Sequence, residues 1–80
     1  MTSYRYRVVY HCPDCGKDHR RGTVIGSDKA DLDGRPLVDA YDGNASSPDI
    51  VAILGEIIRC PTSQRVVTPT LEQHVLEAAR

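Results

Sequence analysis

Three cysteines and three histidines are the residues of this chain whose types and spacing favour metal chemistry. Cys12 and Cys15 stand two residues apart in the turn-forming stretch HCPDCG. Cys60 stands in a second stretch, RCPTSQ, which begins with the same Cys-Pro pair but has Ser63 where a second cysteine would stand. Thiolates presented from tight turns are typical ligands of Zn²⁺. The pattern therefore predicts a site that takes sulfur from both turns.

The sequence leaves the fourth ligand open. His19 is favoured, because it follows Cys15 by four residues and can turn back toward the metal. His74 could reach the site if the last segment of the chain packs over the turns, whereas His11 should point to the opposite face of its strand. Ser63 and a water molecule are further alternatives, although zinc prefers nitrogen and sulfur donors.

Each of the two turns follows an apolar strand and precedes another, in RVVYHC…RGTVIG and in EIIRC…RVVT. With this arrangement the chain resembles the zinc-ribbon class of small domains, in which two such turns face each other across one metal. The resemblance covers residues 4–27 and 56–68. It implies that Cys12, Cys15 and Cys60 are ligands and that the cofactor is Zn²⁺, while Ser63 departs from the pattern.

Two other uses of the cysteines are weighed against zinc. Buried cysteine is a common core residue and needs no metal. A Cys-x-x-Cys pair can be redox-active, but that motif normally opens a helix in a βαβ unit, which this sequence lacks. The stretch DKADLDG resembles a calcium loop, but its register places Lys29 and Ala40 where carboxylates are required.

The elements that must position these residues follow from periodicity. YRYRVVY, residues 4–10, alternates with period two and predicts a strand that turns Tyr6, Val8 and Tyr10 to one side and Arg5 and Arg7 to the other. RGTVIGS, residues 21–27, predicts the return strand of a hairpin. The segment 27–49 reads as a long loop rich in Asp, Gly, Ser and Pro, with a short strand at 35–41.

The second half of the chain predicts two helices and two strands. Ser47, Pro48 and Asp49 favour the start of a short helix that ends near Gly55. Strands at 56–60 and 64–68 flank the second Cys turn. Thr70 and Gln73 are spaced as a capping box, so that a carboxy-terminal helix is expected over residues 68–80. We expect a single α+β domain over residues 1–80, with an antiparallel sheet of about four strands and zinc-ribbon-like turns.

Composition limits the class of protein. Eighty residues without Phe or Trp make a thin core, and a chain of this size buries only roughly 60% of its unfolded surface, so a metal would add needed stability. Residues 1–21 carry a net charge of +3 and residues 22–56 carry −5, which is unlike a wholly basic duplex binder. The sequence shows no signal peptide and no apolar run of membrane-spanning length, and predicts a cytoplasmic protein.

From these observations we expect a non-enzymatic, zinc-stabilised module that binds another protein or regulates it, and the resemblance to zinc ribbons implies action on the transcription machinery. The long acidic loop is the expected contact segment. An enzyme is disfavoured because no general base stands at a recognisable spacing. The alternative is a nucleic-acid-binding zinc ribbon whose basic patch lies near the first turn. That patch would consist of Arg5, Arg7, Lys17, Arg20 and Arg21.

Overall fold

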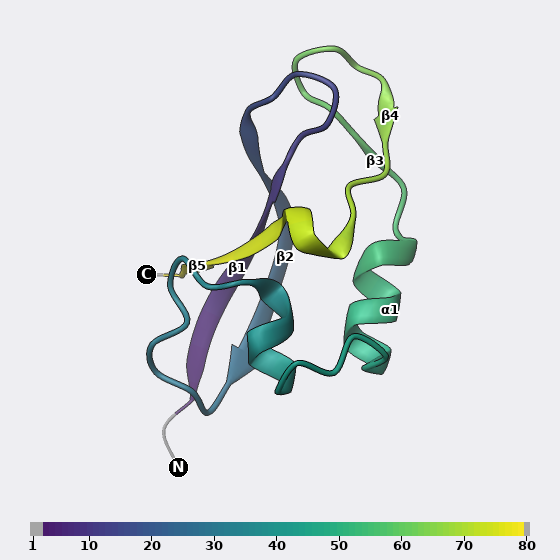
Figure 1. Ribbon diagram of the computed structural model, residues 1–80. Coiled ribbons are helices and arrows are strands. Elements are labelled where there is room, and N and C mark those ends of the chain that lie inside the picture. The colour runs from purple at the N-terminus through teal and green to yellow at the C-terminus, as the bar shows by residue number, and fades with distance from the viewer. Residues whose placement is uncertain (1–2, 80) are drawn as a thin grey trace.

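The computed structural model describes residues 3–79. It contains a three-stranded antiparallel sheet in the order β2-β1-β5, a two-stranded antiparallel sheet of β3 and β4, one α-helix and two short 3-10 helices (Figure 1). The elements are, in chain order, β1 (Tyr4–His11), β2 (Asp18–Ser27), η1 (Leu37–Tyr41), α1 (Pro48–Gly55), β3 (Ile58–Arg59), β4 (Val66–Val67), η2 (Leu71–Gln73) and β5 (His74–Ala78).

The central strand β1 shows the alternation that its sequence predicts. Tyr6, Val8 and Tyr10 are buried on the inner face, whereas Arg5 is exposed and Arg7 is half-buried on the outer face. Alternating faces follow from the pleat of an extended chain, so burial of one face selects this register. The strand at 4–10 and the hairpin partner at 21–27 are confirmed, but the alternation is incomplete, because Val9 is also buried and the register is irregular between Arg7 and Val9.

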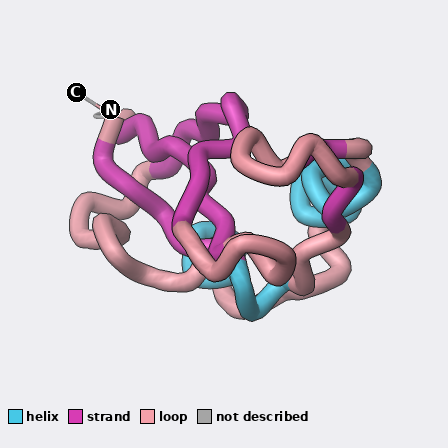
Figure 2. The backbone as a smooth tube through the Cα atoms, turned by 90° about the horizontal axis from the view of Figure 1, so that it is seen from above, coloured by secondary structure: helices cyan, strands magenta, loops and turns pink. Residues whose placement is uncertain are grey.

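α1 and η1 pack against the inner face of the main sheet, and Figure 2 gives the backbone from above. One core cluster joins this face to α1 and η1, and its buried members are Tyr6, Val8, Leu32, Leu37, Ile50, Ile53 and Leu76. A second cluster lies beside the β1–β2 turn, and it consists of Tyr10, Cys12, Cys60 and Val67 with the partly buried Cys15 and Ile58. The cysteines therefore belong to a core that is separate from the main one.

The expected carboxy-terminal helix is wrong. Thr70 and Gln73 do form a capping box, in which the Thr70 N–H donates to Gln73 Oε1 over 2.8 Å. The helix ends after the single turn of η2, because β5 pairs antiparallel with β1 from Tyr10↔His74 to Tyr6↔Ala78. Pairing satisfies the free edge of β1 and buries Leu76, which outweighs the local preference for a helix.

The expected strand at 35–41 is also wrong. Residues 37–41 form η1, which packs Leu37 against the sheet, and the segment pairs with β5 through an isolated bridge between Pro36 and Val75. The described strands number five in two sheets, where about four in one sheet were expected. The short central helix is confirmed as α1, although the Ser47 side chain makes no capping hydrogen bond.

No helix among residues 3–79 combines the length and the apolar character needed to cross a bilayer.

Candidate metal centre

The two Cys-Pro turns have the same backbone geometry. In the first, the Cys12 N–H donates to Lys17 O over 2.8 Å and the Gly16 N–H donates to Cys12 O over 2.9 Å. In the second, the Cys60 N–H donates to Arg65 O and the Gln64 N–H donates to Cys60 O, both over 2.8 Å. In each turn, the first hydrogen bond joins residues five apart in the sequence and the second joins residues four apart. The likeness of HCPDCG and RCPTSQ in sequence is therefore a likeness in structure.

The matched geometry places Ser63 in the second turn where Cys15 stands in the first. It also requires a left-handed residue at the next position, which is Gly16 with φ +75° in the first turn and Gln64 with φ +66° in the second. Glycine adopts this conformation without steric cost, whereas a residue with a side chain does not.

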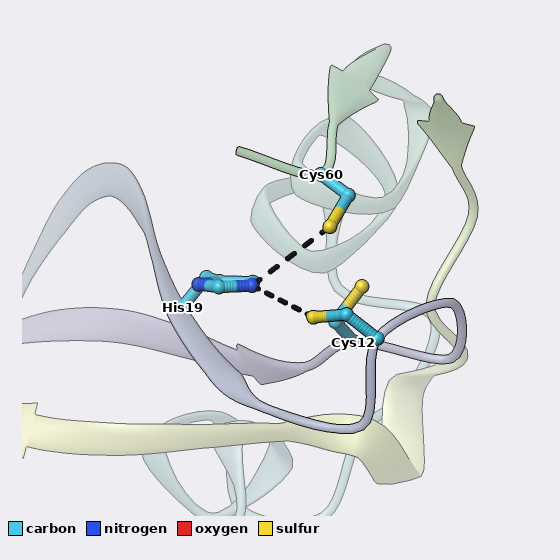
Figure 3. Close-up of side chains that lie close together, drawn as sticks. Cys12, His19 and Cys60 are labelled. Carbon is cyan, nitrogen blue, oxygen red and sulfur yellow. Dashed lines mark hydrogen bonds between the residues drawn. The ribbon is translucent and has the colours of Figure 1, made fainter. Parts of the chain in front are cut away.

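The structure brings together the four residues that the sequence favoured as ligands. The sulfurs of Cys12, Cys15 and Cys60 and a ring nitrogen of His19 all lie within 4.8 Å of one another. His19 Nε2 lies 3.1 Å from Cys15 Sγ and 3.9 Å from Cys60 Sγ. Figure 3 shows the edge of the His19 ring directed between Cys12 and Cys60. Cys12 and Cys60 are fully buried, and Cys15 and His19 are half-buried.

This cluster is close to the size of a tetrahedral zinc site. Zinc–sulfur bonds of about 2.3 Å and zinc–nitrogen bonds of about 2.0 Å place ligand atoms about 3.5–3.8 Å apart. The ligand atoms of the cluster are at most 4.8 Å apart, which exceeds that spacing by only about 1 Å. Small side-chain rotations can close this difference. All three cysteines are free thiols in the structure. The donor set of three sulfurs and one imidazole is one that metal ions such as Zn²⁺ accept.

The surroundings of Cys60 favour its thiolate form. Hydrogen bonds from Ser63, through its hydroxyl and its N–H, lower the pKa of Cys60 to about 6. The Ser63 N–H lies 3.5 Å from Cys60 Sγ. Burial raises the pKa of Cys12, against hydrogen bonds from the backbone of Cys15 and Asp14 that lower it. A cation placed among these sulfurs would favour the thiolate of Cys12 as well.

The other two histidines are engaged elsewhere. His11 Nδ1 forms an exposed 2.9 Å contact with Asp18 Oδ1 on the neighbouring strand. His74 is fully buried, and its Nδ1 donates to the carbonyl of Thr70 over 2.7 Å. Because a carbonyl can only accept, His74 Nε2 is the acceptor atom of the neutral ring, and Arg21 Nη1 donates to it over 3.3 Å.

Arg21 links His74 to the end of the helix α1, a role that the sequence analysis missed. Its guanidinium also donates to the carbonyl oxygens of Ile53 and Glu56 at the carboxy-terminal end of α1. The Ile53 carbonyl also accepts from the Glu56 N–H over 3.3 Å, and a cation is favoured at that end of a helix. Alternation along β2 was the available signal, since Arg21 lies two residues after His19 and so shares its inner face.

The five basic residues of the expected nucleic-acid patch do not form one surface. Arg21 points to the inner face. Arg7 and Arg20 share the outer face, where both approach Glu77 Oε1, over 3.6 Å and 2.9 Å. Arg5 and Lys17 are exposed. Arg20 and Arg21 also belong to β2 rather than to the turn before it.

Comparisons with protein-family models, with curated proteins and with solved structures gave no match for this chain. The geometry of the site is therefore the basis on which a function is proposed.

Proposed function

We propose that the protein is a zinc-stabilised, non-enzymatic module of the zinc-ribbon type, with Cys12, Cys15, His19 and Cys60 as its ligands. The convergence of these four side chains from two distant segments supports the proposal. Zinc rather than a harder cation fits a set of three thiolates and one imidazole. Free thiols are also the form expected in a reducing compartment, in agreement with a cytoplasmic location.

A structural role for the metal fits the site better than a catalytic one. Catalytic zinc sites keep a position open for water or substrate, whereas structural sites use four protein ligands. Four protein ligands are at hand here, and two of them are fully buried. Zinc bound in this way would contribute on the order of 10–16 kcal/mol to folding. The remaining surface would then be available for a protein partner, and the role in transcription stays a prediction.

Metal analysis tests the proposal. Protein purified without added zinc is expected to carry about one equivalent of Zn²⁺ per chain, and its Co²⁺ form is expected to show the absorption of a tetrahedral thiolate complex. Cys60→Ala should remove both signals. His11→Ala, which changes a histidine outside the cluster, should keep them. A folded wild-type protein that takes up neither ion would overturn the proposal.

A further inference from the structure

A groove of about 370 Å³ runs between the outer edge of β2 and the helix α1. From the strand side it is lined by residues 23–26, and from the helix side by Asp49, Ala52, Ile53 and Glu56, with Tyr41. Asp49 and Ala52 are three residues apart and share one side of α1, and Glu56 follows the helix as its C-cap. The groove therefore has a strand edge as one wall and a helix face as the other.

The strand wall of this groove is an unpaired sheet edge. β2 pairs with β1 only, at one end of the order β2-β1-β5. Among residues 3–79, no backbone hydrogen bond outside the sheet involves residues 19–26. The pairing with β1 is regular from Val24 to Ser27, beyond the irregularity at Gly22. Such an edge presents a row of free N–H and C=O groups to an incoming strand.

The helix wall of the groove is acidic. Asp49 and Glu56 are both exposed, and neither forms a salt bridge within the described part of the chain. No Lys or Arg lines the groove. Arg21 lies at one end, where it bonds the main-chain carbonyls of Ile53 and Glu56. This charge disfavours nucleic acid and favours a basic partner.

We propose that this groove binds an extended, basic segment of a partner protein, which adds to the sheet as a strand beside residues 23–27. The proposal rests on the interaction role given above and names its surface. Main-chain hydrogen bonds to β2 supply affinity, and side chains that reach the helix supply specificity. Asp49 lies in the first turn of α1 and Glu56 caps its other end, so that the two carboxylates stand at opposite ends of the helix. Same-face positions of a strand repeat every ~6.7 Å, so lysines two or four residues apart can reach both carboxylates.

The probes are acetylated seven-residue peptides in which lysine alternates with valine or threonine, added to the zinc-loaded full chain. Two-dimensional NMR should show shifted amide signals at residues 23–27 and along α1. The double variant Asp49→Asn with Glu56→Gln should weaken binding about 3- to 10-fold, as expected for two exposed ion pairs. Asp28→Asn with Asp31→Asn, which removes two acids outside the groove, should leave the affinity unchanged.

Methylation of the peptide backbone tests strand addition itself. Only every second amide of an added strand faces β2. Two peptides with opposite sets of alternate amides N-methylated should therefore differ, one losing binding and the other keeping it. Equal binding by both would overturn the strand-addition model.

Two other results would overturn the proposal. If no probe at ~1 mM shifts the amide signals of residues 23–27, binding with a dissociation constant near or below that concentration is excluded. If the chain associates with itself through the same amides, the groove binds a second copy of the chain and not a segment of a partner protein. Metal content is measured on the same sample. A protein that holds metal but does not bind peptide therefore overturns only the groove proposal. A protein that binds peptide but holds no metal overturns only the zinc-site proposal.

Discussion

His74 shows how burial decides the role of a single side chain. Its Nδ1 donates to Thr70 O, and Arg21 donates to its Nε2, so that both nitrogens are used by the neutral ring. Burial lowers the pKa of His74, and the charge of Arg21 lowers it further, against the hydrogen bond to Thr70 that raises it. A protonated ring would face the guanidinium as a like charge. The fold therefore selects the uncharged form.

The pH dependence of stability tests this state of His74. Because the folded pKa lies below the unfolded value of about 6.5, the unfolded chain binds the proton more readily. The stabilising contribution is present above pH ~6.5 and is lost as pH falls through the folded pKa. His74→Asn keeps a donor for Thr70 O and cannot titrate. Denaturant unfolding should show that the zinc-loaded variant loses less free energy of unfolding between pH 7 and pH 5 than the wild type does; equal losses would contradict the assignment.

At the scale of elements, the two Cys-Pro turns are the same structure built from different residues. The left-handed position holds Gly16 in one and Gln64 in the other. The space where a Gly16 side chain would project is open, with no atom within 4 Å. Backbone conformation alone should therefore decide the effect of a substitution at position 16.

Exchange at the two left-handed positions should have opposite effects. Gly16→Ala places a side chain at φ +75° and is expected to lower the free energy of unfolding by about 1–2 kcal/mol. Gln64→Gly relieves the same conformation but gives up the bond from Gln64 Nε2 to Pro61 O. It should raise stability by up to about 1 kcal/mol. Thermal unfolding measures both, and changes of equal sign would disprove the equivalence of the turns.

The equivalence of the turns also predicts a rescue of metal binding. His19→Ala should weaken Zn²⁺ binding by more than the roughly 10–100-fold that substitutions around a metal's ligands cause, because it removes a ligand. Ser63 occupies the place that Cys15 has in the first turn. The double variant His19→Ala with Ser63→Cys should therefore regain affinity, with a four-sulfur Co²⁺ spectrum. Competition with a chromophoric chelator measures the affinity; a double variant no better than His19→Ala would show that position 63 points away from the metal.

At the scale of the whole molecule, the fold has two cores joined by few elements. The larger core holds the main sheet against α1 and η1, whereas the smaller one joins the β1–β2 turn to the β3–β4 hairpin. Each strand of that hairpin has only two residues. Isolated two-stranded pairs are marginal in water, so the hairpin depends on its contact with the cysteine cluster.

Removal of the metal should therefore release the hairpin first. After a chelator is added, amides of residues 58–67 are expected to lose protection against hydrogen exchange before those of Tyr6 and Val8, which are deep in the larger core. Exchange measured by NMR at several times resolves the order. Simultaneous loss at all these amides would show that the cores unfold as one unit.

The sequence alone determined what depends on short-range spacing. Cys12, Cys15 and His19 lie within one hairpin, so their proximity follows from local geometry, and the likeness of RCPTSQ to HCPDCG brought Cys60 into the same prediction. The alternation of β1 and the short helix α1 were equally local, since each is set by periodicity and by a helix start. Metal binding itself stays a prediction of both the sequence and the geometry.

Only the tertiary structure determined the conformation of the last segment and the hydrogen-bond partners of two side chains. Residues 74–78 have helix-forming neighbours and a capping box, yet they form β5, because the free edge of β1 and the space for Leu76 exist only in the folded chain. Arg21 and His74, 53 residues apart in the sequence, form a hydrogen bond for the same reason. Burial removes both groups from water, so each needs a partner within the protein. Long-range demands of this kind leave no periodic signal in a sequence.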